Sequence, residues 1–235
     1  MEIVGAERPG PDRIRERHDR ILARLRETAE RNGHEPGRLR IVAVTKAHPI
    51  EVARSAVGAG VERLGESRVQ EAEPKVAALA AAEWHFIGRL QSNKARRAIR
   101  AFAMIHSVDS VDLLHRLHDL AAEEGRAPAL LLQVNVTGEP AKGGLSPDQA
   151  LSAETLAAAR AAGVVGLMTI APMGGPDEGA RAVFAALREL RDRLQQAAGL
   201  ELPELSMGMS ADADAAAAEG ATLVRIGTAI FGPRA

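Results

Sequence analysis

A single lysine, Lys46, ends an apolar and β-branched run of the chain at residues 39–45. Such a run suits a buried strand, and an ammonium group at its end either reaches water or has a chemical task, because its desolvation is costly. A partly desolvated lysine near other cations becomes a nucleophile toward aldehydes. The candidate chemistry is therefore Schiff-base formation by Lys46, although most lysines beside strands simply reach water.

Two segments near the C-terminus have the composition of a phosphate site. Gly208 and Ser210 come at the end of one apolar run, and Gly227 and Thr228 follow the next one. Glycine lets the backbone approach a ligand closely, and amides at a helix start together with hydroxyl groups bind a dianion. Ordinary tight turns have the same composition, so these segments alone do not separate the two interpretations.

Arg225 precedes Gly227 by two positions, where its guanidinium can point inward and donate to a pyridine nitrogen. A lysine that faces a phosphate site fits a phosphorylated aldehyde. This is either pyridoxal 5′-phosphate (PLP) or the phosphorylated sugar of a Schiff-base aldolase. An aldolase has no need of that arginine, so Arg225 favours PLP. The alternative for Arg225 is a buried arginine in an ion pair.

These side chains need elements that bring them together, and short apolar runs alternate with helical patterns along the chain. Runs of this kind are typical of buried strands. We predict strands at residues 39–45, 61–65, 84–88, 104–108, 129–136, 164–170, 204–209 and 222–226. We predict helices between them at residues 49–59, 67–80, 92–101, 110–124, 147–162, 177–198 and 211–219.

Alternating strands and helices indicate parallel pairing through right-handed crossovers. Eight such strands predict an α/β fold, a single (β/α)8 TIM-type barrel, with an extra amphipathic N-terminal helix at residues 12–32. A doubly wound open sheet is the alternative, but no Gly-x-Gly-x-x-Gly segment follows the first strand. We expect a flexible leader at residues 1–11 and one PLP-binding domain at residues 12–235.

Polar residues fall directly after the predicted strands, which in a barrel places them around one mouth. Besides the two glycine-containing segments, they are Lys46, Glu66, Ser67, Arg89, Asp109, Asn135 and Thr169. The barrel therefore brings a lysine after the first strand into the same mouth as a phosphate site after the last two.

Composition excludes several classes of function. The formal net charge of -1 and the aromatic content of 2% give no support to nucleic-acid binding. The absence of Cys excludes disulfides and thiolate chemistry. No long apolar stretch predicts a membrane span, and the N-terminal residues lack an apolar signal core. We expect a cytoplasmic protein without a metal, and a monomer.

The motifs resemble those of the pyridoxal phosphate homeostasis protein family, whose fold resembles the N-terminal barrel of alanine racemase. The most specific matches are WHFIGRLQSNK at residues 84–94 and the segment LSMGMSADADAAAAEGATLVRIGTAIFG at residues 205–232. Further matches are AVTKAHP, GES with VQE, IHSVD, VNVTGEPAKGGL and GLMTI. They cover nearly the whole chain after residue 38.

The resemblance implies that PLP is held as an internal aldimine on Lys46. It also implies that Arg225 lies near the pyridine nitrogen. Phosphate contacts are implied for Ser206, Met207, Gly227 and Thr228, the first two partly through backbone amides, and Ser210 belongs to the same segment.

Three further positions are weaker candidates for cofactor contact, and a fourth departs from the family pattern. Family members often have Asn where this chain has Ser67, and many have a second lysine where it has His48. At Ser67 a cofactor contact is expected to be weakened or replaced by a hydroxyl, and His48 puts in doubt any shuttling of the cofactor through a neighbouring lysine. Lys142 matches a lysine of the family and is a candidate for transient cofactor contact, although a solvated loop lysine is an equal alternative. Asn135, after the fifth strand, is another candidate contact.

The sequence argues against efficient turnover of amino acids. Racemases with this barrel use a lysine and a tyrosine as two bases, and this sequence contains no Tyr. From the length of 235 residues we also expect no room for the β-rich domain that carries that tyrosine in the racemases. An arginine at the pyridine nitrogen also makes the ring a weak electron sink. His85 and His106 are expected in the core rather than as bases.

We therefore expect a protein that holds, buffers or delivers PLP, with PLP-dependent apo-enzymes as possible recipients. A PLP-dependent racemase-like enzyme is the alternative, and a Schiff-base aldolase is the second alternative.

Overall fold

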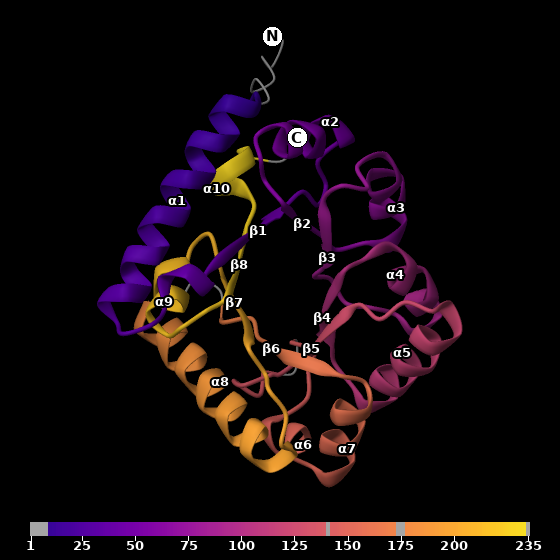
Figure 1. The fold of residues 1–235 in the computed structure, drawn as a ribbon. Coiled ribbons are helices and arrows are strands. Elements are labelled where there is room, and N and C mark those ends of the chain that lie inside the picture. Colours follow the sequence, from indigo (N-terminus) through magenta and orange to yellow (C-terminus); the bar gives the residue numbers. More distant parts are fainter. Residues whose placement is uncertain (1–8, 140–141, 173–176, 234–235) are drawn as a thin grey trace.

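The computed structural model describes residues 9–139, 142–172 and 177–233. Within these residues, eight parallel strands close into a barrel in the order β1-β2-β3-β4-β5-β6-β7-β8 (Figure 1). The predicted (β/α)8 barrel is therefore confirmed, and the alternative of an open sheet is wrong. The barrel closes because β1 pairs with β8, and no local sequence pattern predicts this pairing.

The strands lie where the sequence predicts them, with ends that differ by a few residues. Two of them, at residues 104–108 and 204–209, have the predicted bounds. The observed strands are β1 Arg40–Val44, β2 Arg63–Glu66, β3 Glu83–Phe86, β4 Met104–Val108, β5 Ala129–Gln133, β6 Val164–Met168, β7 Glu204–Met209 and β8 Leu223–Ile226.

Helices surround the barrel on its outside (Figure 1). They are α1 Pro11–Arg31, α2 Ile50–Gly58, α3 Val69–Ala78, α4 Ala95–Ala101, α5 Val111–Glu124, α6 Pro147–Ala150, α7 Ala153–Ala161, α8 Asp177–Ala198, α9 Ala213–Ala218 and α10 Thr228–Phe231. Two 3₁₀ turns, η1 Pro36–Arg38 and η2 Ser92–Lys94, precede β1 and α4. None of the described helices combines the length and apolar character needed to cross a bilayer.

Three helix predictions need correction. The helix predicted at residues 147–162 is two helices, because the Ser152 hydroxyl accepts a hydrogen bond from the Thr155 amide and starts α7 anew. Residues 92–94 of another predicted helix form a 3₁₀ turn. The short helix α10 at residues 228–231 was not predicted, since four residues carry no periodic signal.

The N-terminal helix begins earlier than predicted. Pro11, assigned to the leader from the sequence, is the first residue of α1, where proline is favoured because its missing N–H would have no partner there. Residues 1–8 of the predicted leader lie outside the described part of the chain. Figure 1 shows α1 running beside α9 and α10, so the two ends of the described chain lie on the same side of the barrel.

The hydrophobic residues form two clusters. The larger one fills the space between the strands and the outer helices. The smaller one lies inside the barrel and consists of Val42, Met104, Leu131, Met168 and Leu223. This inner cluster supplies only part of the barrel filling, and polar side chains from neighbouring strands supply the rest.

Candidate functional site

Lys46 follows β1 by two residues and is half-buried. The next residue, Ala47, has a φ of 59°, which is a left-handed conformation that is uncommon for a residue other than glycine. The chain therefore turns sharply directly after Lys46. His48 contacts the ring of Phe231 in α10, with 5.7 Å between the ring centroids. This contact ties the turn after β1 to the segment after β8.

The pairing of β1 with β8 places Lys46 beside one of the two predicted phosphate segments. Val42 pairs with Arg225 in this ladder, and Ala43 pairs with Ile226. A Cβ on Gly227 would lie 3.4 Å from the carbonyl oxygen of Val44, so Gly227 packs closely on the end of β1. Lys46 and the segment that begins at Gly227 therefore leave adjacent strands at the same edge of the barrel.

Arg225 is a buried cation, with only 5% of its surface exposed. Its NH1 donates to the Ser206 hydroxyl at 2.6 Å, and its NH2 donates to the Thr169 carbonyl at 2.9 Å. Burial lowers the pKa of Arg225 to about 10, and Asp212 partly opposes this shift. Arg225 therefore stays cationic at neutral pH. Among the described residues, its Nε has no hydrogen-bond partner and can serve a ligand.

The predicted phosphate segments supply exposed hydroxyls and glycine backbone. Ser210 and Thr228 are both exposed, and Thr228 is the first residue of α10. The first amides of a helix have no acceptor within it, so they are available to an anion. Gly208 has a φ of 85°, and a Cβ there would lie 2.5 Å from the Cβ of Ala216, so this position requires glycine.

Ser206 and Met207, on β7, have side chains that are committed elsewhere. The Ser206 hydroxyl is fully buried and bonds to His106 and Arg225. The Met207 side chain packs in the outer hydrophobic core. The phosphate contacts implied for these two residues stay a prediction, in which the backbone amides of Ser206 and Met207 bind the phosphate.

The three weaker candidates lie at other strand ends. Ser67 follows β2, where a Cβ on Gly88 would lie 2.1 Å from the Ser67 carbonyl oxygen. Asn135 donates to the carbonyls of Glu139 and Lys142, at 2.8 and 3.0 Å, and thereby shapes the loop after β5. Lys142 pairs with Glu139 at 2.9 Å, which lowers the pKa of Glu139. Their cofactor contacts stay predictions.

A buried ion pair that the sequence analysis missed supports the end of β1. Lys75 of α3 donates to Glu66 at 2.6 Å and to the Thr45 carbonyl at 3.0 Å, and the Thr45 hydroxyl donates to the same Glu66 oxygen at 2.7 Å. Lys75 follows Val69 and Ala72 at three-residue spacing on the buried face of α3. That spacing was the available signal. The pair fixes the residue that precedes Lys46.

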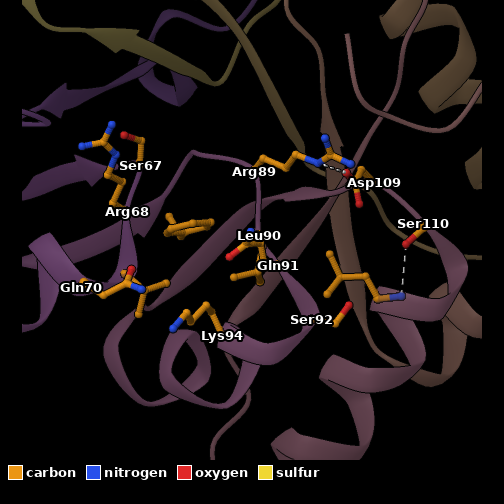
Figure 2. Close-up of a pocket in the computed structure, with 13 residues that line it drawn as sticks. Ser67, Arg68, Gln70, Arg89, Leu90, Gln91, Ser92, Lys94, Asp109 and Ser110 are labelled. Carbon is orange, nitrogen blue, oxygen red and sulfur yellow. Dashed lines mark hydrogen bonds and ion pairs between the residues drawn. The ribbon is translucent and has the colours of Figure 1, made fainter. Parts of the chain in front are cut away.

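A cavity of about 800 Å³ lies beside this site, over the ends of β2, β3 and β4 (Figure 2). Its lining includes Ser67, Arg68, Arg89, Lys94 and Asp109, and Lys46 is not among the lining residues. The volume is in the range of small-molecule sites. Because it lacks the lysine and the segments after β7 and β8, it is a neighbour of the candidate cofactor site rather than that site.

Comparison with known proteins identifies relatives along most of the chain. Residues 18–235 match the family described as alanine racemase, N-terminal domain. A protein from Aquifex aeolicus named "Pyridoxal phosphate homeostasis protein" is 42% identical over 223 residues, which are 93% of this chain and 97% of the relative. A protein of the same name from Synechocystis sp. is 42% identical over 203 residues, which are 85% of this chain and 93% of the relative.

Solved structures agree with these relatives. The structure of PipY from Synechococcus elongatus, with PLP bound, is 43% identical with a TM-score of 0.78, and the match covers 90% of this chain and 100% of PipY. D-threo-3-hydroxyaspartate dehydratase from Delftia sp. is 23% identical with a TM-score of 0.68, over 92% of this chain and 59% of the dehydratase. This second likeness shows the fold alone.

Proposed function

This chain belongs to the pyridoxal phosphate homeostasis protein family, and we propose that it binds PLP and holds, buffers or delivers it inside the cell. The observation that carries this proposal is the β1–β8 pairing, which sets Lys46, Arg225 and the Gly227 segment at one edge of the barrel. A relative that is 43% identical has been solved with PLP bound, which supports the same ligand here.

The donor set fits the chemical groups of PLP. Lys46 provides an amine for the aldehyde, and Ser210, Gly227 and Thr228 provide hydroxyls and amides for the phosphate. The Nε of Arg225 provides a donor for the ring nitrogen. A phosphorylated sugar has no ring nitrogen, so this donor set does not favour the aldolase.

When bound, PLP supplies an electron-withdrawing ring to an amine that is joined to it. The residues of this chain bind and orient the ligand but do little to strengthen that withdrawal. Because Arg225 stays cationic at neutral pH, its N–H would donate to the ring nitrogen and oppose protonation of that nitrogen. The sequence also contains no Tyr that could act as a second base. These features favour a carrier over an amino-acid racemase, and apo-enzymes that need PLP are the proposed recipients.

Borohydride trapping tests this proposal. The purified chain with PLP should absorb near the visible edge, and reduction followed by peptide mass spectrometry should place the label on Lys46. Lys46→Ala should abolish the label. Lys94→Ala is the matched control, since Lys94 is a half-buried lysine over the same barrel face, and it should be labelled like the unmodified chain. Undiminished labelling of Lys46→Ala, on another lysine, would contradict the proposal.

A further inference from the structure

Hydrogen bonds between side chains cross the barrel interior from its N-terminal edge to Arg225. Glu83, the first residue of β3, lies 3.0 Å from His85 Nε2. His85 Nδ1 lies 2.8 Å from His106 Nε2, and His106 Nδ1 lies 2.7 Å from the Ser206 hydroxyl. The Ser206 hydroxyl then accepts from Arg225 at 2.6 Å. We call these five residues the interior polar chain.

The chemistry of the two ends fixes the direction of these hydrogen bonds when both imidazoles are neutral. A guanidinium only donates, so the Ser206 oxygen accepts from Arg225. The hydrogen bond with His85 lowers the pKa of Glu83, and Arg63 lies 3.1 Å from the same carboxylate, so Glu83 accepts. His85 therefore carries its hydrogen on Nε2 and accepts at Nδ1.

The hydrogen positions in the middle of the interior polar chain follow from those at its two ends. His106 is fully buried, and desolvation, His85 and Arg225 together hold its pKa well below 6.5, so the ring is neutral at pH 7. Its Nε2–H donates to His85, which leaves Nδ1 to accept the hydroxyl hydrogen of Ser206. With its hydrogen held by His106, Ser206 presents a lone pair to Arg225.

We infer that His85, His106 and Ser206 are positioning residues that fix the guanidinium of Arg225 against the ring nitrogen of PLP. The inference rests on the proposed function. Within the described residues, Arg225 has one further acceptor, the Thr169 carbonyl, so Ser206 supplies one of the two contacts seen there for its terminal nitrogens. Loss of the Ser206 contact leaves a buried guanidinium with an unpaired N–H, and its orientation is then less constrained.

Ser206→Ala tests the inference with the smallest change. We expect PLP to bind about fivefold more weakly, the scale of one lost hydrogen bond. Binding of the analogue in which carbon replaces the ring nitrogen should not change. The ¹⁵N chemical shift of ring-labelled PLP should move in the variant. Equal losses for both ligands with an unchanged ¹⁵N shift would overturn the inference and leave Ser206 a structural role only.

A matched pair at His106 tests the next link. His106→Asn keeps an acceptor close to the position of Nδ1 and should retain most of the native ¹⁵N shift, whereas His106→Leu has no acceptor and should reproduce the effect of Ser206→Ala. Identical ¹⁵N shifts for the two variants would count against the inference. If the unmodified chain is not labelled at Lys46, the proposed function fails instead, so the two failures are distinguishable.

The cavity over β2, β3 and β4 is a different observation with its own consequence. Arg68, Arg89 and Lys94 line it together with the carboxylate of Asp109, and Arg68 also pairs with Glu71 at 2.6 Å. Arg89 is 86% exposed and lies 3.8 Å from Asp109, which is a weak pair that leaves Arg89 able to turn. Lys94 is half-buried, and Arg97 and, more weakly, Lys94 lower the pKa of Glu73. In the part of the chain that the structure describes, the Nζ of Lys94 makes no hydrogen bond or ion pair within the usual distances.

We propose that this cavity binds a small organic anion, a carboxylate or phosphate carried on an apolar body. Figure 2 shows Arg68, Arg89 and Lys94 distributed around the cavity rather than gathered at one side. Val69, Phe86, Leu90 and Leu113 supply an apolar surface among these cations. An anion with an apolar body satisfies both parts of this lining, whereas a bare inorganic anion satisfies only the cations.

Titration with benzoate, monitored by amide NMR, tests this second site. Residues 89–94 and 110–113 should show saturable shifts, and inorganic phosphate should bind at least about fivefold more weakly than benzoate. Lys94→Met should weaken benzoate binding several-fold, whereas Arg116→Met, an exposed position on α5, should not. Lys46→Ala should leave the shifts intact. Unchanged binding in Lys94→Met, or shifts that do not saturate, would overturn the proposal.

Discussion

Thr228 is an exposed hydroxyl at the first position of α10, directly after Gly227. We predict that Thr228→Val weakens PLP binding by about 1–2 kcal/mol, the scale of one lost charge-assisted hydrogen bond. Binding of unphosphorylated pyridoxal should change little, because that ligand has no anion to lose. Absorbance titrations of the two ligands measure both effects. Equal losses would show that the phosphate lies elsewhere.

His106 makes the stability of the fold depend on pH. Burial lowers its pKa in the folded state below that of the unfolded chain, so the unfolded chain binds the proton first as the pH falls. The contribution of neutral His106 to the free energy of unfolding should therefore be fully present above about pH 6.5 and should decrease below it. We predict that His106→Asn flattens the slope of unfolding free energy between about pH 6 and 5 by up to about 1.4 kcal/mol per pH unit. Urea unfolding at each pH measures this, and an unchanged slope would contradict it.

Among the elements, α3 and the ends of β1 and β2 depend on one buried ion pair. Lys75 is 6% exposed and Glu66 is fully buried. We predict that Lys75→Met destabilises the protein by about 3–5 kcal/mol, because it leaves a buried carboxylate without its cation. The double variant Lys75→Met with Glu66→Leu should recover much of this loss. Denaturant unfolding measures both, and a single variant as stable as the unmodified chain would contradict the argument.

At the scale of the molecule, the described residues form one barrel with the described helices outside it, and the sequence contains no Tyr. Because one general base alone contributes about 10²–10⁴-fold to a rate, we predict no substantial racemase, transaminase or decarboxylase turnover on common amino acids. Chiral chromatography over a panel of amino acids measures this, beside a PLP transfer assay with an apo-enzyme. Turnover of about 1 s⁻¹ or more, an ordinary enzymatic rate, would overturn the carrier proposal.

The sequence by itself determined which residues could do chemistry and which elements carry them. The spacing of apolar residues predicted the eight strands and most of the helices, because the repeat of a strand or a helix is a local property of the chain. The position of Lys46 after an apolar run, and of glycines and hydroxyls after two others, pointed to an amine and an anion site. Most strand ends, the break at Ser152 and the four-residue α10 were missed, because capping and short turns depend on individual side-chain contacts.

Only the tertiary structure decided which of these residues meet. The ladder between β1 and β8 sets Lys46 beside Gly227, and it exists only because the curved sheet closes on itself. The hydroxyl of Ser206 bonds to His106, a hundred positions away in the chain, so the phosphate contact predicted for Ser206 is left to its backbone amide. The pairing of Lys75 with Glu66 exists only because α3 packs on β2. Each of these depends on distance in space between residues remote in sequence, and a periodic pattern contains no information about that distance.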